Sequence, residues 1–137
     1  MYATETTSGA GFWKSTDGGD NWTEITSGLP SNGQRFSIGV SPASPSVVYV
    51  LCSISSAYGG LYRSNNSGSS FGTQSTTPNI LTWNESPPSS GGGGQGWYDL
   101  AIAIDPTDED VVYTGGVNVF KSTNAGVSWD CVAHWVG

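Results

Sequence analysis

Aromatic residues with polar neighbours are the first candidates for chemistry in this sequence, because the apolar face of a sugar ring stacks on an aromatic ring. Trp83, Trp97 and Tyr98 lie in or beside a segment rich in Gly, Pro and Ser. Tyr58 lies in a loop expected at Cys52 to Gly60. Together they predict a carbohydrate-binding platform, with Trp83 favoured by its polar surroundings. For Trp97 and Tyr98 an alternative stays open, in which they seal the space between two sheets.

Two titratable side chains are candidates to act beside that platform. Asp99 follows Tyr98 and aligns with Arg35 of a repeated segment, so both are expected near one central channel. A carboxylate there could act as a general acid or base, although glycoside hydrolysis needs two of them. His134 follows the last expected strand and is expected on the same side of the molecule. A lone His is more often a surface or packing residue than a catalyst.

Charge and composition exclude several other classes of function. Four Lys or Arg against eleven Asp or Glu give a net charge of −7, which argues against binding nucleic acid. No stretch approaches the roughly 18 apolar residues of a membrane span. Asp17, Asp20 and Glu24 lack the dense spacing of a calcium loop, and no metal or cofactor is expected. Cys52 and Cys131 fit no ligand pattern and are interpreted as buried strand residues, with a disulfide left open.

The elements that position these residues are indicated by an internal repeat. Three segments share one pattern. An apolar residue, an aromatic residue, a basic residue and Ser follow one another directly, and Asp or Asn, Gly and a second aromatic residue come after them at fixed spacing. The shared positions are Ser15, Asp17, Gly19 and Trp22; Ser64, Asn66, Gly68 and Phe71; and Ser122, Asn124, Gly126 and Trp129. An Asp or Asn side chain can bond its own backbone two residues on, and Gly accepts a positive φ. Each copy therefore predicts a hairpin turn.

A second repeat supplies two further strands. Ser37 to Pro42 matches Ala101 to Pro106, and a Val-Val-Tyr segment begins five residues after each Pro, at Val47 and Val111. Apolar residues alternate with small ones in each copy, which is the period of a strand. Each copy is therefore expected to be a strand, a Pro-led turn and a second strand.

Joined in order, the unit has four antiparallel strands over about 40 to 50 residues, which is the blade of a β-propeller. The fold class is therefore all-β, an incomplete ring of about two and a half four-stranded blades. The expected divisions are a partial blade at 1–35, a complete blade at 36–74, a connector at 75–97 and a complete blade at 98–137. A ring needs at least about four blades, so further blades or other copies must close it.

Blade topology also predicts which loops share an end of the molecule. The Pro-led turns and the three repeated turns are expected at one end, and the remaining loops and connectors at the other. The candidate platform belongs to that second end. The glycine run Gly91 to Gly94 within the connector is expected to have no means of packing, because it lacks side chains.

The Ser-x-Asp-x-Gly-x-x-Trp turn resembles the Asp box, or BNR repeat. Ser15 to Trp22 matches it fully, while Asn66 and Asn124 replace the acid. Families that share the box include sialidases, xyloglucanase-type glycoside hydrolases, sortilin-like receptors and photosystem assembly factors. The segments around Asp105 and Lys121 look most like large secreted bacterial proteins of the type IX secretion kind, often labelled glycosyl hydrolase or sortilin-like. The resemblance implies that Asp17 shapes a turn and is not catalytic.

The resemblance also implies an extracellular or cell-surface protein. We expect a segment that binds carbohydrate or a surface protein and is not an enzyme on its own. One alternative is a fragment of a xyloglucanase-type glycoside hydrolase, since those enzymes place a catalytic Asp near a stretch similar to Gly96 to Pro106, which contains Asp99. Another is a structural repeat of an adhesin or filament. A sialidase is disfavoured, because such enzymes have an arginine triad and this chain offers Arg35 and Arg63 alone.

Overall fold

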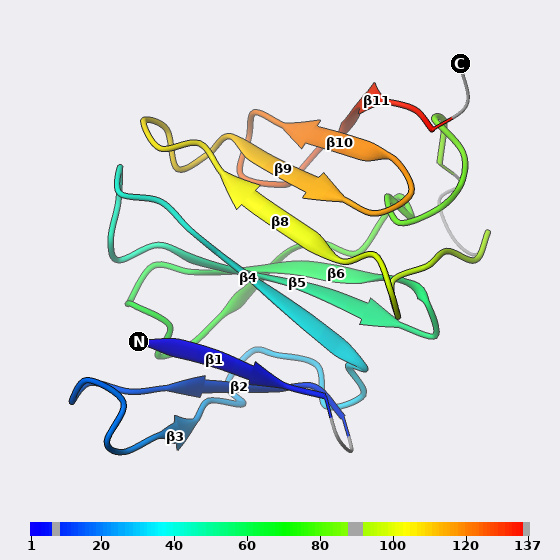
Figure 1. Ribbon diagram of the computed structural model, residues 1–137. Coiled ribbons are helices and arrows are strands. Elements are labelled where there is room, and N and C mark those ends of the chain that lie inside the picture. Colours follow the sequence, from blue (N-terminus) through cyan, green and yellow to red (C-terminus); the bar gives the residue numbers. More distant parts are fainter. Residues whose placement is uncertain (7–8, 88–91, 136–137) are drawn as a thin grey trace.

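The computed structural model describes residues 1–6, 9–87 and 92–135, which form three antiparallel β-sheets (Figure 1). The prediction of an all-β propeller segment is confirmed. Among these residues there is no helix that could cross a membrane.

The three sheets follow one another along the chain, and the second lies between the other two (Figure 1). The first contains β1 (Tyr2–Glu5), β2 (Gly11–Lys14) and β3 (Thr23–Glu24). The second contains β4 (Arg35–Val40), β5 (Val48–Ile54), β6 (Ala57–Ser64) and β7 (Gly72–Ser75). The third contains β8 (Ala101–Ile104), β9 (Val112–Gly115), β10 (Val119–Ser122) and β11 (Asp130–Ala133). In each sheet the strands pair in sequence order.

The pairing register shows which strands are equivalent. One tyrosine in each sheet faces the basic residue of the neighbouring strand, in the pairs Tyr2↔Lys14, Tyr49↔Arg63 and Tyr113↔Lys121. Strand β1 is therefore the counterpart of β5 and β9. Within the described residues, the first sheet has no counterpart of β4 and β8.

The core lies on both faces of the second sheet. Strand β5 is buried from Val48 to Ser53, because alternate side chains face opposite neighbours. Tyr49 and Leu51 pack with Phe120 of the third sheet, whereas Val48 and Val50 pack with Phe12 of the first. A strand covered on both sides must be apolar throughout, as Val-Tyr-Val-Leu is. Cys52 and Cys131 are free thiols in different clusters, and Cys131 is only half-buried.

The three repeated turns, at 15–22, 64–71 and 122–129, share one hydrogen-bond pattern, and we name them the Ser-Asx-Gly turns. The serine Oγ accepts from the backbone N–H of the glycine in each turn, at 2.9, 2.9 and 2.8 Å. It also donates to the Asp or Asn side chain at 2.8 to 2.9 Å. Gly19, Gly68 and Gly126 have positive φ, as predicted from sequence. The residue before each glycine also has positive φ, although in two turns it is Ser67 or Ala125.

The prediction of a loop from Cys52 to Gly60 is wrong. Strand β5 continues to Ile54 and β6 begins at Ala57, so only Ser55 and Ser56 form the turn. Both have positive φ, +50° and +68°, as in the two-residue turns that match the twist of paired strands. Such turns favour Asn-Gly, so the Ser-Ser pair concealed the hairpin in the sequence.

The sheets share two distinct ends. One, the turn end, contains the Pro-led turns and the Ser-Asx-Gly turns, which contact each other through Ser67 N–H to the Ser46 carbonyl at 2.8 Å. The other, the connector end, contains the β5–β6 turn and the segment between β7 and β8 (Figure 1). The chain thus separates a repeated end from an irregular one.

Candidate functional site

A groove of about 700 Å³ opens at the connector end, between the first sheet and the end of the connector. Its lining consists of Thr4, Thr6, Gln34, Arg35, Phe36, Trp97 and Tyr98. Polar and aromatic groups therefore share one concave surface. Only the two aromatics and Arg35 are suggested by the sequence pattern, since Thr4, Thr6 and Gln34 belong to no motif.

Trp97 and Tyr98 form an exposed aromatic pair at this groove. Their side chains are 65% and 69% exposed, and their ring centroids are 5.5 Å apart with the planes tilted by 50°. The alternative in which these rings seal the space between two sheets is therefore wrong. Trp97 and Tyr98 therefore remain candidates for the carbohydrate-binding platform.

The backbone of this pair is fixed although its rings are exposed. The Gln95 carbonyl accepts from the N–H groups of Tyr98 and Asp99, at 2.7 and 2.8 Å. The Arg35 guanidinium donates to the carbonyl oxygens of both Trp97, at 3.1 Å, and Tyr98. A cation on β4 thus anchors the turn that presents the two rings.

Close approach to neighbouring atoms explains the glycines before this turn, with a side chain at Gly96 and with backbone at Gly94. A Cβ at Gly96 would lie 2.3 Å from Ser53 Oγ, and one at Gly94 would lie 2.4 Å from the Leu81 carbonyl oxygen. Asn79 Nδ2 donates to the Gly93 carbonyl at 2.7 Å. The expectation that the glycine run has no means of packing is therefore wrong at Gly93 and Gly94, because their backbone makes the contacts. Gly91 lies outside the described residues.

A second aromatic pair lies at the connector end. Trp83 and Trp135 meet edge to face with centroids 6.4 Å apart, and they are 39% and 60% exposed. The Trp83 carbonyl oxygen accepts from Trp135 Nε1 at 3.2 Å, and His134 Nε2 lies 3.2 Å from the same oxygen. The structure thus brings Trp83 and His134 together, with Trp135 as the additional member.

The assignment of Tyr58 to the platform is wrong. This side chain is 8% exposed, and its hydroxyl contacts the Ser75 carbonyl at 3.0 Å and the Ser75 Oγ at 2.8 Å. Burial raises the pKa of the Tyr58 hydroxyl far above its usual range. The residue is part of the core because the hairpin at Ser55 and Ser56 places it inside β6.

Asp99 does not open a strand as expected, since β8 begins two residues later at Ala101. It is half-buried in the turn after Tyr98, and it is not among the residues that line the groove. The hydrogen bonds of Arg35 go to the two neighbouring carbonyls, and no ion pair joins it to Asp99 in the described part of the chain. Its position beside the aromatic pair keeps Asp99 a candidate.

The Asp17 carboxylate is engaged by its own turn. It accepts from Asn21 N–H at 3.0 Å, from Asn21 Nδ2 at 2.7 Å and from Ser15 Oγ at 2.8 Å. These hydrogen bonds hold the pKa of Asp17 well below its usual range. Across residues 1–6, 9–87 and 92–135, no cluster of three or more His, Cys, Asp or Glu could hold a metal ion.

Comparison with known proteins finds similar proteins by structure alone. No family model matches the chain, and no curated protein matches it significantly. The fold matches the GH74 xyloglucanase from Xanthomonas campestris with a TM-score of 0.62 and 23% identity, over 93% of this chain and 18% of that one. An ancestral GH74 enzyme matches with a TM-score of 0.57 and 18% identity, over 96% and 16%. The chain thus spans less than a fifth of either enzyme, and at these identities the likeness shows the fold.

Proposed function

We propose that this chain is a segment of an extracellular glycoside-hydrolase-like propeller and that its groove binds a polysaccharide chain across Trp97 and Tyr98. The observation that carries the proposal is the exposed ring pair at the groove, held from behind by Arg35. Large exposed aromatics on a fixed backbone lose little conformational entropy when they bind a ligand. Apolar patches rimmed by polar groups commonly mark binding sites.

The likeness to GH74 xyloglucanases favours a glucan chain as the ligand. Trp97 and Tyr98 would stack against successive sugar rings, while Thr4 and Gln34 offer hydrogen bonds to hydroxyl groups. The groove is open to solvent along the connector end, as a site for a long polymer must be.

Binding, and not bond cleavage, is the role we assign to this segment. Hydrolysis of a glycosidic bond needs two carboxyl groups about 5 to 10 Å apart. The described lining of the groove contains no carboxylate. If the parent protein is a hydrolase, Asp99 is the candidate contributed by this segment, and a second carboxylate comes from elsewhere in the ring.

Affinity electrophoresis through gels with soluble xyloglucan tests the binding role. We expect the chain to be retarded, and we expect a Trp97→Ala/Tyr98→Ala variant to bind about tenfold more weakly. Val127→Ala is the matched control, because Val127 is 60% exposed at the turn end. Unretarded wild-type protein, or equal retardation of the double variant, would contradict the proposal.

The candidate role of Asp99 in hydrolysis has to be tested in a protein that contains the whole propeller ring. There we expect Asp99→Asn to abolish xyloglucan cleavage while xyloglucan binding persists, because the amide keeps the size of the carboxyl group but cannot exchange a proton. An unchanged rate would remove Asp99 from consideration and leave a binding segment.

We also infer that the Ser-Asx-Gly turns are Asp boxes and that the parent protein is secreted, as in the type IX secretion proteins that the sequence resembles. The shared serine, Asx and glycine contacts support the first inference. Detection of the native protein in the culture supernatant or on the cell surface would test the second. Recovery only from the cytosol would contradict it.

A further inference from the structure

The groove carries a charge opposite to that of the whole chain. Its described lining contains one charged side chain, the cation of Arg35, in a chain whose net charge is −7. The acidic residues nearest to the lining in sequence, Glu5 and Asp99, do not belong to it. Side chains alternate across a strand, so Glu5 lies on the opposite face of β1 from Thr4. The groove therefore offers a positive site in an acidic protein.

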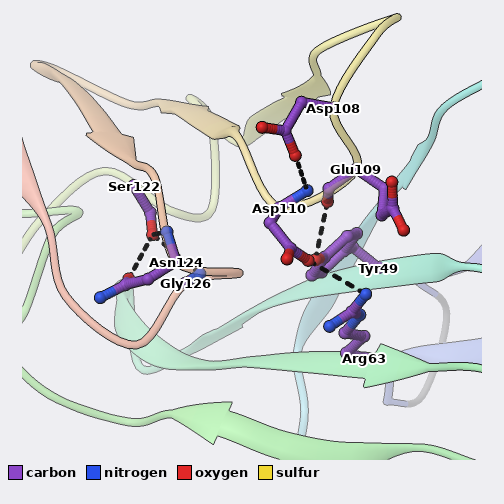
Figure 2. Close-up of polar contacts among 8 residues, drawn as sticks. All are labelled: Tyr49, Arg63, Asp108, Glu109, Asp110, Ser122, Asn124 and Gly126. Atoms are coloured by element: carbon purple, nitrogen blue, oxygen red, sulfur yellow. Dashed lines mark hydrogen bonds and ion pairs between the residues drawn. The ribbon is translucent and has the colours of Figure 1, made fainter. Parts of the chain in front are cut away.

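The two arginines of the chain differ in what balances their charge. Arg63 at the turn end pairs with the Asp110 carboxylate at 3.1 Å, as Figure 2 shows. Arg35 at the connector end bonds two backbone carbonyls, which are neutral acceptors, and no ion pair joins it to a carboxylate within residues 1–6, 9–87 and 92–135. The charge of Arg63 is therefore balanced inside the protein, whereas that of Arg35 is available to a ligand.

The hydrogen bonds of Arg35 leave one edge of its guanidinium unoccupied. Both bonds, to the carbonyl oxygens of Trp97 and Tyr98, start from Nη1. The Nε and Nη2 atoms make no hydrogen bond with another residue of the described chain. These two nitrogens form a fork whose parallel N–H groups match the two oxygens of a carboxylate. A lining residue of the groove thus retains a bidentate donor for a carboxylate.

Gln34 contributes further donors to the same groove. Its Oε1 accepts from the backbone N–H of Ser55 at 2.8 Å, so the amide oxygen is engaged by the β5–β6 turn. The Nε2 group, with two N–H donors, is what the Gln34 amide has left to offer a ligand. An ionised carboxylate accepts hydrogen bonds and donates none. The free polar groups of Arg35 and Gln34 are therefore of the kind that a carboxylate needs.

We propose that the groove selects a polysaccharide whose sugar units carry a carboxylate, and that this uronate is held by the Nε–Nη2 edge of Arg35 and the Gln34 amide. The sugar ring stacks on Trp97 or Tyr98 at the same time, so the inference rests on the proposed function and narrows its substrate class. A neutral glucan stacks on the same rings but leaves the Arg35 fork unmatched. We therefore expect the neutral chain to bind more weakly than the uronate.

Isothermal titration calorimetry of the full chain with two ligands that differ only at C6 tests the preference. One is cellotetraose, and the other is its C6-oxidised form, in which each hydroxymethyl group is a carboxylate. At neutral pH and about 20 mM salt we expect the oxidised ligand to have an about tenfold lower dissociation constant. The preference should fall below about threefold in about 0.5 M salt, because salt screens charges at an open surface.

Gln34→Glu tests where the carboxylate is held. Glutamate keeps an acceptor for the Ser55 N–H, but it replaces the two free donors with an anion in the groove. We expect the preference for the oxidised ligand, taken as the ratio of the two dissociation constants, to fall about tenfold. Gln74→Glu is the matched control, because it makes the same charge change on β7 outside the groove lining. There the ratio should stay within about twofold of wild type.

The outcomes separate this inference from the proposed function. Equal affinity for the two tetrasaccharides, with both weakened in Trp97→Ala/Tyr98→Ala, would overturn the uronate preference and leave the polysaccharide groove in place. Binding of neither ligand would overturn both. A preference that Gln34→Glu reduces no more than Gln74→Glu does would also overturn the inference, because the carboxylate would then be held elsewhere.

Discussion

The two ends of this molecule are built from the same strands but use their polar groups in opposite ways. At the turn end, Ser, Asx and Gly bond one another in three near-identical turns, and their side chains are engaged within the protein. At the connector end, glycine and Asn79 hold the backbone, and aromatic rings are left exposed. Among the described residues, the exposed aromatic at the turn end is Trp22, at 37%, against 65% and 69% for Trp97 and Tyr98.

Under the proposed binding role, this difference separates the residues that stabilise the fold from those that bind a ligand. The repeated turns set the register of each hairpin and the spacing between sheets, so they cannot vary much without loss of packing. The connector has only to return the chain to the next blade, and its side chains are therefore available for binding. Substitutions at the turn end should therefore cost stability, and substitutions of the exposed rings should cost binding.

The largest expected loss of stability is at Gly126. Gly126→Ala would place Cβ 2.1 Å from the fully buried Leu61 at a φ of +86°, so overpacking adds to backbone strain. We expect a loss of about 3 kcal/mol in the free energy of unfolding, measured by urea denaturation. Gly18→Ala is the control, because φ is +82° but nothing lies within 4 Å, and we expect about 1 kcal/mol. Equal losses of stability in the two variants would mean that the close contact between Gly126 and Leu61 does not contribute.

A smaller loss is expected at Ser122. Its Oγ donates to Asn124 Oδ1 and accepts from the N–H groups of Asn124 and Gly126, at 2.9, 3.2 and 2.8 Å. Ser122→Ala leaves the buried Gly126 N–H without this acceptor, and we expect about 2 kcal/mol in urea denaturation. Thr123→Ala, at the exposed neighbouring position, should cost less than about 0.5 kcal/mol. A neutral Ser122→Ala would show that the turn does not depend on its serine.

Two tyrosines at or near the connector end sharpen the comparison further. Tyr58→Phe removes a buried hydroxyl that contacts Ser75, and we expect a loss of about 1 kcal/mol with unchanged xyloglucan retardation. Tyr98→Phe should leave stability within about 0.5 kcal/mol, because the side chain is 69% exposed. Reduced retardation of Tyr58→Phe would return that residue to the binding surface.

The smallest expected effect is the contribution of Asp17 to the change in stability at acidic pH. Because its pKa is lowered in the folded state, ionised Asp17 contributes stability that is fully present above the usual value of 3.8. That contribution is lost as the pH falls through the folded-state pKa. We therefore expect Asp17→Asn to have a flatter stability profile below about pH 4 in urea denaturation. The reciprocal Asn66→Asp should steepen it, and parallel profiles would contradict the argument.

The repeat made most of the fold predictable, but not its exceptions. Serine, Asx and glycine at fixed spacing specify a turn through local bonds, so all three turns were correctly predicted. The Ser55–Ser56 turn was missed because serine carries no preference for positive φ, and Tyr58 was misplaced with it. The exposure of Trp97 and Tyr98 was left open because it depends on where the connector crosses the sheets, and no local pattern records that.

By itself, the sequence determined the four-stranded repeat, its strand order and the separation of the two ends. These properties follow from hydrogen bonds between residues close in the chain and from the alternation of apolar side chains. Only the tertiary structure decided that Arg35 holds the Trp97–Tyr98 turn from 62 and 63 residues away and that Tyr58 is buried. It also decided that Phe12 and Leu61 of the preceding sheets pack against Gly68 and Gly126, because burial and contacts between sheets depend on how all three pack together.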